Sequence, residues 1–322
     1  MEIDLISNLI ISPMIVSSKV PAAYKQVSIV DYLAGRFTYR SHAVWLGFVV
    51  DGRVSCNGRL AAPKTIVTQG DVVACDLPDV VPADVNFDYQ ILYEDEWLLG
   101  IDKPPNLRVH DKRRYAQANL IYHLRTQHLP PYPEVTLVNR LDQNTSGVIL
   151  AARDPQTAKH LQSQFANKTV EKEYLAVVAG CPSPADGVID LPLSRLDSLP
   201  GVYRHGVMAR GKTAVTHFHT LQTFSNQYAF LQLHPKTGRT HQLRVHLAAI
   251  GHPILGDKLY RMTDEEFVAW VVEKRPSPTD LIHRQALHSV RTTFIHPDTE
   301  RPCTIEAPLP DDMWQLLQKL GE

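Results

Sequence analysis

The alternation of apolar and polar residues along the chain predicts many short strands, with helices between them at irregular intervals. Residues 171–180, 214–224 and 228–235 alternate in the manner of half-buried strands. Residues 154–165 and 240–251 instead repeat apolar side chains at helical spacing. Because strands dominate and do not alternate regularly with helices, the pattern predicts an α+β fold. Its sheet is expected to be mixed, largely antiparallel, and flanked by helices and loops.

The two predicted helices carry residues that are typical of helix ends. Asp154 followed by Pro155 is expected to begin the first helix, as N-cap and first turn. Thr240 is the expected N-cap of the second helix, and Gly251 is its expected end. Leu243 shares a face with two further apolar residues of this second helix, so we expect that face to be buried.

The first part of the chain has a different order of elements, which predicts a separate small domain. Two short helices, a hairpin with Asn57-Gly58 at its turn and a closing strand follow one another there. We predict an N-terminal extension at 1–22, a small α/β module at 23–80, a linker at 81–88 and a larger domain at 89–322.

Composition is that of an ordinary globular protein from a reducing compartment. The 322 residues are enough for two hydrophobic cores. The four cysteines have neither the spacing of a zinc knuckle nor that of a CxxC redox pair, so a cytoplasmic location is expected. The apolar run from Leu9 to Val16 is too short to span a membrane, and no basic leader precedes it, so no membrane partner is expected.

The net charge of −1 hides an uneven distribution of charged residues. No Asp or Glu occurs between Asp197 and Asp257, whereas this interval contains seven histidines and six cations. The cations are Arg204, Arg210, Lys212, Lys236, Arg239 and Arg244. A polyanion would meet this positive charge locally, so the nearly even overall balance does not exclude a nucleic-acid partner.

Several other kinds of chemistry lack their sequence signals. The 15 histidines form no HExxH pair and have no cysteine at ligand spacing, so no metal site is expected. A metal-dependent hydrolase that uses the histidines is left as an alternative. No GxSxG motif, GxGxxG motif or P-loop occurs, which argues against a serine-hydrolase elbow and a glycine-rich phosphate loop.

One carboxylate lies at a bend between two apolar runs, in VNRLDQNTSGVIL, which begins at Val138. Arg140 and Asp142 are two positions apart at this bend, and hence on one face if the chain is extended. A carboxylate at such a bend ordinarily accepts hydrogen bonds from the backbone of the turn. Taken alone, Asp142 fits that structural role.

The stretch NRLDQNTSG resembles the hairpin motif of the RluA/RluC/RluD family of RNA pseudouridine synthases. Four further stretches resemble motifs of that family in the same order: IDKPPNLRVH, EKEYLAVVAG, GKTAVTHFHTL and GRTHQLRVHLAAIGHPILGDKLY. Upstream, VDYLAGRF and GRVSCNGRLAAPKTIVTQGDVV resemble the small RNA-binding module named after ribosomal protein S-four. Five motifs in one order over residues 90–260 argue against coincidence.

The resemblance implies that 89–322 is a catalytic domain and that 23–80 is an RNA-binding module. The implied activity is the isomerisation of uridine to pseudouridine in structured RNA, without metal or other cofactor. Large-subunit ribosomal RNA is the implied partner, transfer RNA is the alternative, and a monomer is expected. The second hypothesis is a non-catalytic RNA-binding or RNA-folding protein on the same scaffold.

The resemblance also implies a catalytic set of Asp142, Tyr174 and Arg244. Since burial raises the pKa of a carboxyl group, Asp142 needs a cationic partner to stay ionised, and an arginine can bind both carboxylate oxygens. The family pattern gives this role to Arg244, with Arg239 as the alternative. Asp142 would act as nucleophile or as general base. Tyr174 is expected to lie against the uracil once the base has left the RNA stack.

Further residues are expected around the substrate by the same resemblance. Arg140 would fill the gap left by the flipped base, and Leu243 would line the pocket. Lys103 and Lys212 would contact the RNA backbone or, alternatively, have structural roles. The family commonly has His where this chain has Asn139, which puts in question any role of this position in RNA docking.

Overall fold

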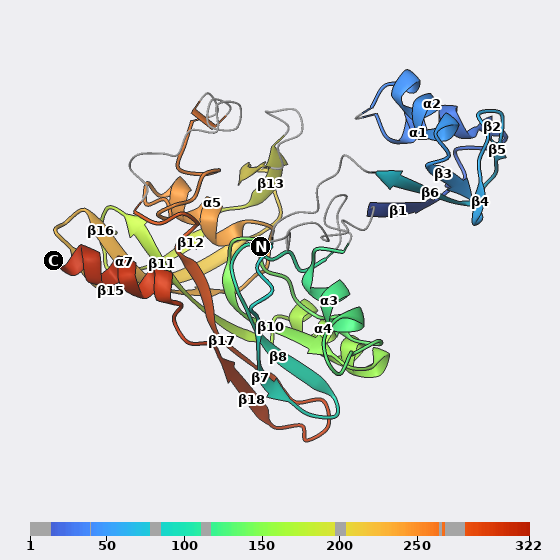
Figure 1. Cartoon of the computed structure of the whole chain (residues 1–322). Coiled ribbons are helices and arrows are strands. Elements are labelled where there is room, and N and C mark those ends of the chain that lie inside the picture. The colour runs from blue at the N-terminus through green and yellow to red at the C-terminus, as the bar shows by residue number, and fades with distance from the viewer. Residues whose placement is uncertain are drawn as a thin grey trace, which may run out of the picture. The chain divides into compact units, whose positions relative to one another are not determined.

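The computed structural model describes residues 14–38, 40–77, 85–110, 117–196, 204–263, 266–267 and 281–322. These residues belong to two units, both drawn in Figure 1. The smaller unit holds the described residues up to 77 together with Gln117, and the larger unit holds the others. No helix in the described part of the chain is both long and apolar enough to cross a membrane.

The smaller unit combines short strands with two short helices. Its elements are β1 (Met14–Lys19), β2 (Val27–Ser28), α1 (Ile29–Arg36), α2 (His42–Val50), β3 (Val54–Cys56), β4 (Arg59–Leu60), β5 (Ile66–Val67) and β6 (Val72–Leu77). Strands β1, β6, β3 and β4 form one antiparallel sheet in that order, and β2 pairs with β5. The two helices, the hairpin and the closing strand that the sequence predicts are all present.

Local sequence explains how the helices of this unit begin and what they bury. Ser28 and Ser41 lie at the two N-caps, where each side-chain oxygen accepts a backbone N–H of the first turn. Tyr32 of α1 and Trp45 of α2 are almost completely buried and belong to the same apolar cluster. The smaller unit therefore has a core of its own.

The N-terminal limit of this unit differs from the prediction. Residues 1–22 are predicted as an extension, but β1 lies within that range and pairs with β6 from Met14↔Leu77 to Lys19↔Val72. The short run MIVSSK does not alternate, so its pairing could not be recognised from the sequence. Residues 81–84 of the predicted linker lie outside the described part of the chain.

The larger unit is built around a long mixed sheet. Its elements are β7 (Gln90–Glu94), β8 (Leu98–Lys103), α3 (Leu120–Thr126), β9 (Thr136–Leu137), β10 (Ser146–Ala152), α4 (Pro155–Ala166), β11 (Glu171–Ala179), β12 (Asp186–Asp190), β13 (Leu193–Leu196), β14 (Arg204–Val207), β15 (Val215–Phe224), β16 (Tyr228–Pro235), α5 (Gln242–Ala249), β17 (Leu287–Ile295), β18 (Pro302–Glu306) and α7 (Asp311–Gly321). The sheet order is β12-β15-β16-β11-β17-β10-β8-β7, with β9 paired to β10 and β18 to β17. Only the β10–β17 pair is parallel among these described strands, which confirms the predicted α+β class with a mixed, largely antiparallel sheet.

Strand β10 is buried on both faces, which explains its continuous apolar sequence. Val148 and Leu150 pack in one cluster with residues of α4. Ile149 and Ala151, which alternate with them, pack in another cluster with residues of α3. Figure 1 shows both helices beside β8 and β10. The bend that carries Asp142 therefore leads directly into a rigid strand.

The parallel contact between β10 and β17 requires a glycine. Gly147 has φ +107°, and a Cβ atom on it would lie 2.2 Å from the backbone oxygen of Ser289 on β17. Ser289 pairs with Gly147 on one side and with Tyr174 of β11 on the other. Strand β17 thus joins the strand that follows Asp142 to the strand that carries Tyr174.

Candidate active site

The loop that carries Asp142 is closed by a side chain, Asn139. After the short β9–β10 ladder, Val138 N donates to Leu150 O at 3.0 Å. Leu150 N then donates to Asn139 Oδ1 at 2.8 Å, so the side chain continues the ladder by one more hydrogen bond. This contact gives Asn139 a structural role at the end of the hairpin, which the sequence did not indicate.

Lys103 lies beneath the same loop and is completely buried. Its Nζ donates to the backbone oxygens of Pro104 at 2.7 Å, Leu107 at 3.0 Å and Gln143 at 3.1 Å. Burial lowers the pKa of Lys103 to about 7, while three carbonyl acceptors match the three donors of the ammonium form. Contact with RNA does not fit this burial, so the structural alternative for Lys103 is the one that agrees with the geometry.

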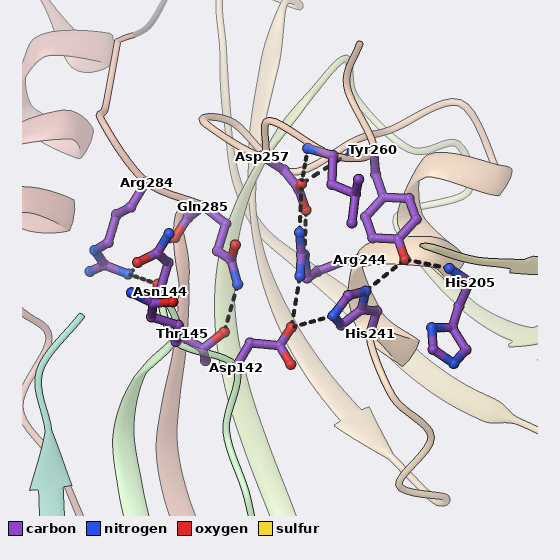
Figure 2. Close-up of polar contacts among 12 residues, drawn as sticks. Asp142, Asn144, Thr145, His205, His241, Arg244, Asp257, Tyr260, Arg284 and Gln285 are labelled. Atoms are coloured by element: carbon purple, nitrogen blue, oxygen red, sulfur yellow. Dashed lines mark hydrogen bonds and ion pairs between the residues drawn. The ribbon is translucent and has the colours of Figure 1, made fainter. Parts of the chain in front are cut away.

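A segment that enters from the C-terminal part of the chain holds the other side of the loop (Figure 2). Gln285 Nε2 donates to Thr145 Oγ1 at 2.9 Å, and Arg284 Nη1 donates to Asn144 O at 3.4 Å. Arg284 is itself held by Asp312 of α7, at 2.6 Å and 2.7 Å. These supports come from residues that the sequence analysis left unassigned.

Arg244 of α5 binds Asp142 and a second carboxylate at once (Figure 2). Its Nη1 donates to Asp142 Oδ2 at 2.8 Å. Its Nε and Nη2 donate to Asp257 Oδ2 and Oδ1 at 2.6 Å and 2.9 Å. The side chain of Asp257 has 0% exposure, so the guanidinium is fixed from the buried side and presents its remaining nitrogen to Asp142.

This arrangement keeps Asp142 ionised. Burial opposes its charge, but nearby His241, Arg244 and Arg140 outweigh burial and hold the pKa of the Asp142 carboxyl below its ordinary value. Because burial lowers the pKa of His241 itself to about 4, His241 is neutral at pH 7. At neutral pH the charge that stabilises Asp142 is therefore mainly that of Arg244.

The N-terminus of α5 differs from the prediction. The N-cap is His241 rather than Thr240, with φ 58°, and its side chain caps no backbone group. The side chain of Gln242 holds the turn instead, because its Oε1 accepts from Arg239 N at 3.0 Å and from Thr237 Oγ1 at 2.7 Å. The left-handed backbone at His241 is a conformation that non-glycine residues rarely adopt.

His241 is oriented by a chain of hydrogen bonds (Figure 2). His205 N donates to Tyr260 Oη at 3.0 Å, and Tyr260 Oη lies 2.7 Å from His241 Nδ1. Since the phenol accepts from His205, its own proton can be donated to Nδ1, and in that tautomer the imidazole proton is on Nε2. His241 Nε2 lies 3.8 Å from Asp142 Oδ2, so in that tautomer the ring directs its N–H toward the carboxylate.

Six of the eight predicted site residues line one cavity of about 360 Å³. They are Arg140, Asp142, Tyr174, Arg239, Leu243 and Arg244. Lys103 is buried beneath the loop, and Lys212 is exposed but does not line this cavity. Arg239, the alternative partner for Asp142, instead donates its Nε to Thr213 O at 3.0 Å.

Tyr174 and Leu243 both contribute to the apolar part of the cavity. Leu243 is 6% exposed, and partly buried Tyr174 packs against the same apolar cluster. Burial raises the pKa of Tyr174 to about 12, so its phenol stays protonated at neutral pH. An aromatic face, an apolar wall and one ionised carboxylate are thus combined, an arrangement that suits a planar polar ring.

Two functional contacts were missed by the sequence analysis although their residues lie in or beside recognised motifs. Asp257 and Tyr260 both fall in the last stretch, which ends GDKLY. Asp257 Oδ1 also accepts the backbone N–H groups of Leu259 and Tyr260, so this turn is built around the carboxylate that holds Arg244. An Asp followed by a turn in the same motif as Arg244 was the available signal.

No group of three or more His, Cys, Asp or Glu side chains that could hold a metal occurs among the residues for which the structure gives positions. The paired histidines of β15 illustrate this. His219 Nδ1 contacts Asp186 Oδ1 at 2.5 Å on the exposed surface, with no third ligand grouped with them. The contact is therefore an exposed polar contact of the sheet surface.

Comparisons with known proteins agree with this geometry. A family model described as RNA pseudouridylate synthase matches residues 98–249. The ribosomal large subunit pseudouridine synthase D of Xylella fastidiosa (strain Temecula1) is 35% identical over 320 residues, which cover 92% of this chain and 93% of that protein. The uncharacterized RNA pseudouridine synthase YlyB of Bacillus subtilis (strain 168) is 34% identical over 282 residues, covering 85% and 87%.

A solved structure gives the same result. Human RNA pseudouridylate synthase domain containing 4 superposes with a TM-score of 0.55 and 27% sequence identity, covering 71% of this chain and 92% of that one. The relatives extend over most of the chain, and their shared description is the activity that the five sequence motifs imply. This chain belongs to the RluA-type family of RNA pseudouridine synthases, and it is an RNA-modifying isomerase.

Proposed function

We propose that this enzyme isomerises a specific uridine of large-subunit ribosomal RNA, and that Asp142 is its catalytic carboxylate. The observation that carries the proposal is the ion pair between Asp142 and Arg244 in a cavity that Tyr174 and Leu243 also line. Asp142 Oδ2 accepts from Arg244, whereas Oδ1 has no partner among the described residues. One carboxylate oxygen is thus fixed, and the other is available to a substrate.

The reaction needs little beyond such a carboxylate. The C1′–N1 bond of uridine breaks, a C1′–C5 bond forms, N1 gains a proton, and the proton from C5 goes to solvent. Asp142 acts either as nucleophile on the sugar or base, or as general base on the sugar. Because the product is an isomer of the substrate, the sum of these steps requires no energy source and no redox cofactor.

The other cavity residues have roles in binding the uridine. The base must leave the RNA stack to reach Asp142, and Tyr174 offers an aromatic face for it. Arg140 is exposed at the rim of the cavity, where its guanidinium can stack on the bases that remain. Lys212 is exposed, so its predicted contact with the RNA backbone stays a prediction.

The choice of ribosomal RNA rests on the relatives and on the smaller unit. Several relatives at 31–36% identity are called ribosomal large subunit pseudouridine synthase D. The smaller unit has the order of helices and strands that the sequence predicts for an RNA-binding module. Transfer RNA is the alternative substrate. The cytoplasmic location and the monomeric state stay predictions.

Mapping of pseudouridines in total RNA, with and without the gene, tests this proposal most broadly. The expected result is the loss of one or a few pseudouridines from large-subunit ribosomal RNA in the strain without the gene. Loss confined to transfer RNA would reject the ribosomal target but keep the enzyme assignment. An unchanged map, together with no activity of the purified enzyme on RNA from that strain, would favour a protein that binds RNA without modifying it.

A further inference from the structure

Lys172 has an unusual position in the wall of the cavity. It lies on β11, two residues before Tyr174, and both side chains line the cavity. Side chains two apart on a strand point to the same face, at a separation of about 7 Å. A cationic side chain, Lys172, therefore precedes Tyr174, the proposed contact of the base, on the same strand and the same face.

The ammonium group of Lys172 is only partly satisfied by the protein. It is half-buried, and its Nζ donates to Thr237 O at 3.3 Å. No carboxylate pairs with Lys172 within the described ranges of the chain. Burial, together with the neighbouring charge of Lys236, lowers the pKa of Lys172 to about 8. An ammonium that is removed from water without a counter-charge is unfavourable unless an anion supplies the missing contacts.

Two further lysines lie at the same cavity. Lys236 follows β16, and Lys168 lies in the turn between α4 and β11. Both are exposed, and neither forms an ion pair with another described residue. Among the residues that the structure describes, six cationic side chains and one carboxylate, Asp142, line the cavity, and Asp142 is already paired with Arg244. The three lysines therefore leave a local excess of positive charge.

We infer that Lys172, Lys236 and Lys168 form a binding site for a phosphate of the RNA backbone adjacent to the uridine in the cavity. This site rests on the proposed function, because it places the phosphate beside Lys172, two residues along β11 from Tyr174, which is proposed to contact the base. Lys172 supplies the partly buried contact, and the two exposed lysines add charge at the rim. A phosphate would supply further acceptor oxygens for the Lys172 ammonium, which has Thr237 O as its acceptor in the described structure. Its negative charge would raise the pKa of Lys172 back toward the ordinary value.

The test uses the full-length protein and an unmodified transcript of large-subunit ribosomal RNA as the probe. The dissociation constant is measured between about 50 and 200 mM salt for the wild type and for Lys172→Gln, Lys236→Gln and Lys172→Arg. Lys159→Gln is the matched control, because Lys159 is an exposed lysine of α4 that does not line the cavity. Thermal unfolding of each variant checks that the fold is intact.

Each glutamine variant at the site is expected to reduce the slope of log K against log salt by about 0.7 to 1. The affinity of Lys172→Gln should fall by about tenfold, as expected for the loss of one charge-assisted contact. Lys172→Arg and Lys159→Gln should keep the wild-type slope. The Lys236 side chain forms no hydrogen bond with another described residue, so Lys236→Gln should not destabilise the fold. This variant therefore still tests the site if Lys172→Gln is unstable.

Wild-type salt slopes for both Lys172→Gln and Lys236→Gln, in folded proteins, would overturn the phosphate site. A loss in Lys159→Gln equal to that in Lys172→Gln would also overturn it, because the effect would then reflect general charge. Failure of the proposed function gives a different result. In that case the wild type itself would release no tritium from RNA labelled at C5 of uridine, whatever the salt slopes of the variants.

Discussion

Arg244 donates to Asp142 at 2.8 Å across 102 positions of sequence, and the same guanidinium holds the buried Asp257 with its other two nitrogens. The two carboxylates are not equivalent. Asp257 is completely buried, accepts two backbone N–H groups and fixes the arginine, whereas Asp142 borders the cavity with 21% of its side chain exposed. Arg244 is therefore a rigid cation that keeps Asp142 charged and correctly aimed.

Replacing Arg244 by lysine should cost both stability and activity. A compact ammonium lacks the planar fork with which Arg244 binds both oxygens of Asp257 and also reaches Asp142, so one of the two buried carboxylates loses its contact. We expect a loss of about 3–5 kcal/mol in the free energy of unfolding, measured by urea denaturation. The double variant Arg244→Gln with Asp257→Asn should recover stability but not tritium release. Recovery of both would contradict the role of Arg244 beside Asp142.

Replacing Asn139 by alanine should affect stability rather than RNA affinity. The variant removes the acceptor of the Leu150 N–H, so the end of the hairpin that precedes Asp142 loses one hydrogen bond. The expected cost is about 1–2 kcal/mol in the free energy of unfolding. RNA binding, measured by filter binding, should stay within twofold of the wild type. A variant of unchanged stability that binds RNA much more weakly would show that Asn139 acts in docking.

Replacing Lys103 by methionine should make the loop that carries Asp142 less well fixed. The variant leaves carbonyl oxygens of Pro104, Leu107 and Gln143 without their shared donor, at an expected cost of about 1–3 kcal/mol. The single-turnover rate should fall, because Gln143 is next to Asp142, while the dissociation constant for RNA should not change. Weaker RNA binding with unchanged stability would restore the RNA contact predicted from the sequence.

The rate of the chemical step should be independent of pH from about 5 up to the range in which Lys103, with its pKa of about 7, begins to lose its proton. The pKa of Asp142 lies below its ordinary value of 3.8, so the carboxylate is ionised throughout this range, and its charge is lost only as the pH falls through that lowered pKa. Its contribution to stability follows the same sign: present above the ordinary pKa and lost as pH falls through the lowered one. The pKa of Tyr174, about 12, keeps the phenol protonated on the alkaline side.

Arg244→Gln provides the contrast for this pH profile. Without the guanidinium, burial is no longer opposed, so the acid limb of the single-turnover rate should move to higher pH. Any residual activity of the variant should therefore rise with pH in a range where the wild type is constant. An acid limb at the same pH in both proteins would show that Arg244 does not hold Asp142 in its ionised form.

The sequence predicted the residues of the cavity better than it predicted their supports. The resemblance to the family grouped three residues from separate motifs, namely Asp142, Tyr174 and Arg244. All three line the same cavity in the structure. His241 stood next to recognised residues, but its role depends on a left-handed backbone and on Tyr260, which no local pattern reveals. For Lys103 the sequence left an RNA contact and a structural role equally open. Its three carbonyl partners come from two separate loops, and no local pattern shows that these loops meet at Lys103.

The fold was predictable where the pattern was local. The apolar run of β10 and the cap of α4 at Asp154 gave elements that the structure contains. Strand β17 was not recognised, because it lies between β10 and β11 and is buried along much of its length without regular alternation. That strand positions Gly147 against Ser289, so the least recognisable strand is one that holds the site together.

The most direct test of the account is tritium release from RNA labelled at C5 of uridine, comparing the wild type with Asp142→Asn. The asparagine keeps the size of the side chain but has no charge, so it can act neither as nucleophile nor as general base. The account predicts normal folding, RNA binding close to that of the wild type, and no release of tritium. Release at the wild-type rate by Asp142→Asn would contradict the assignment of Asp142 as the catalytic residue.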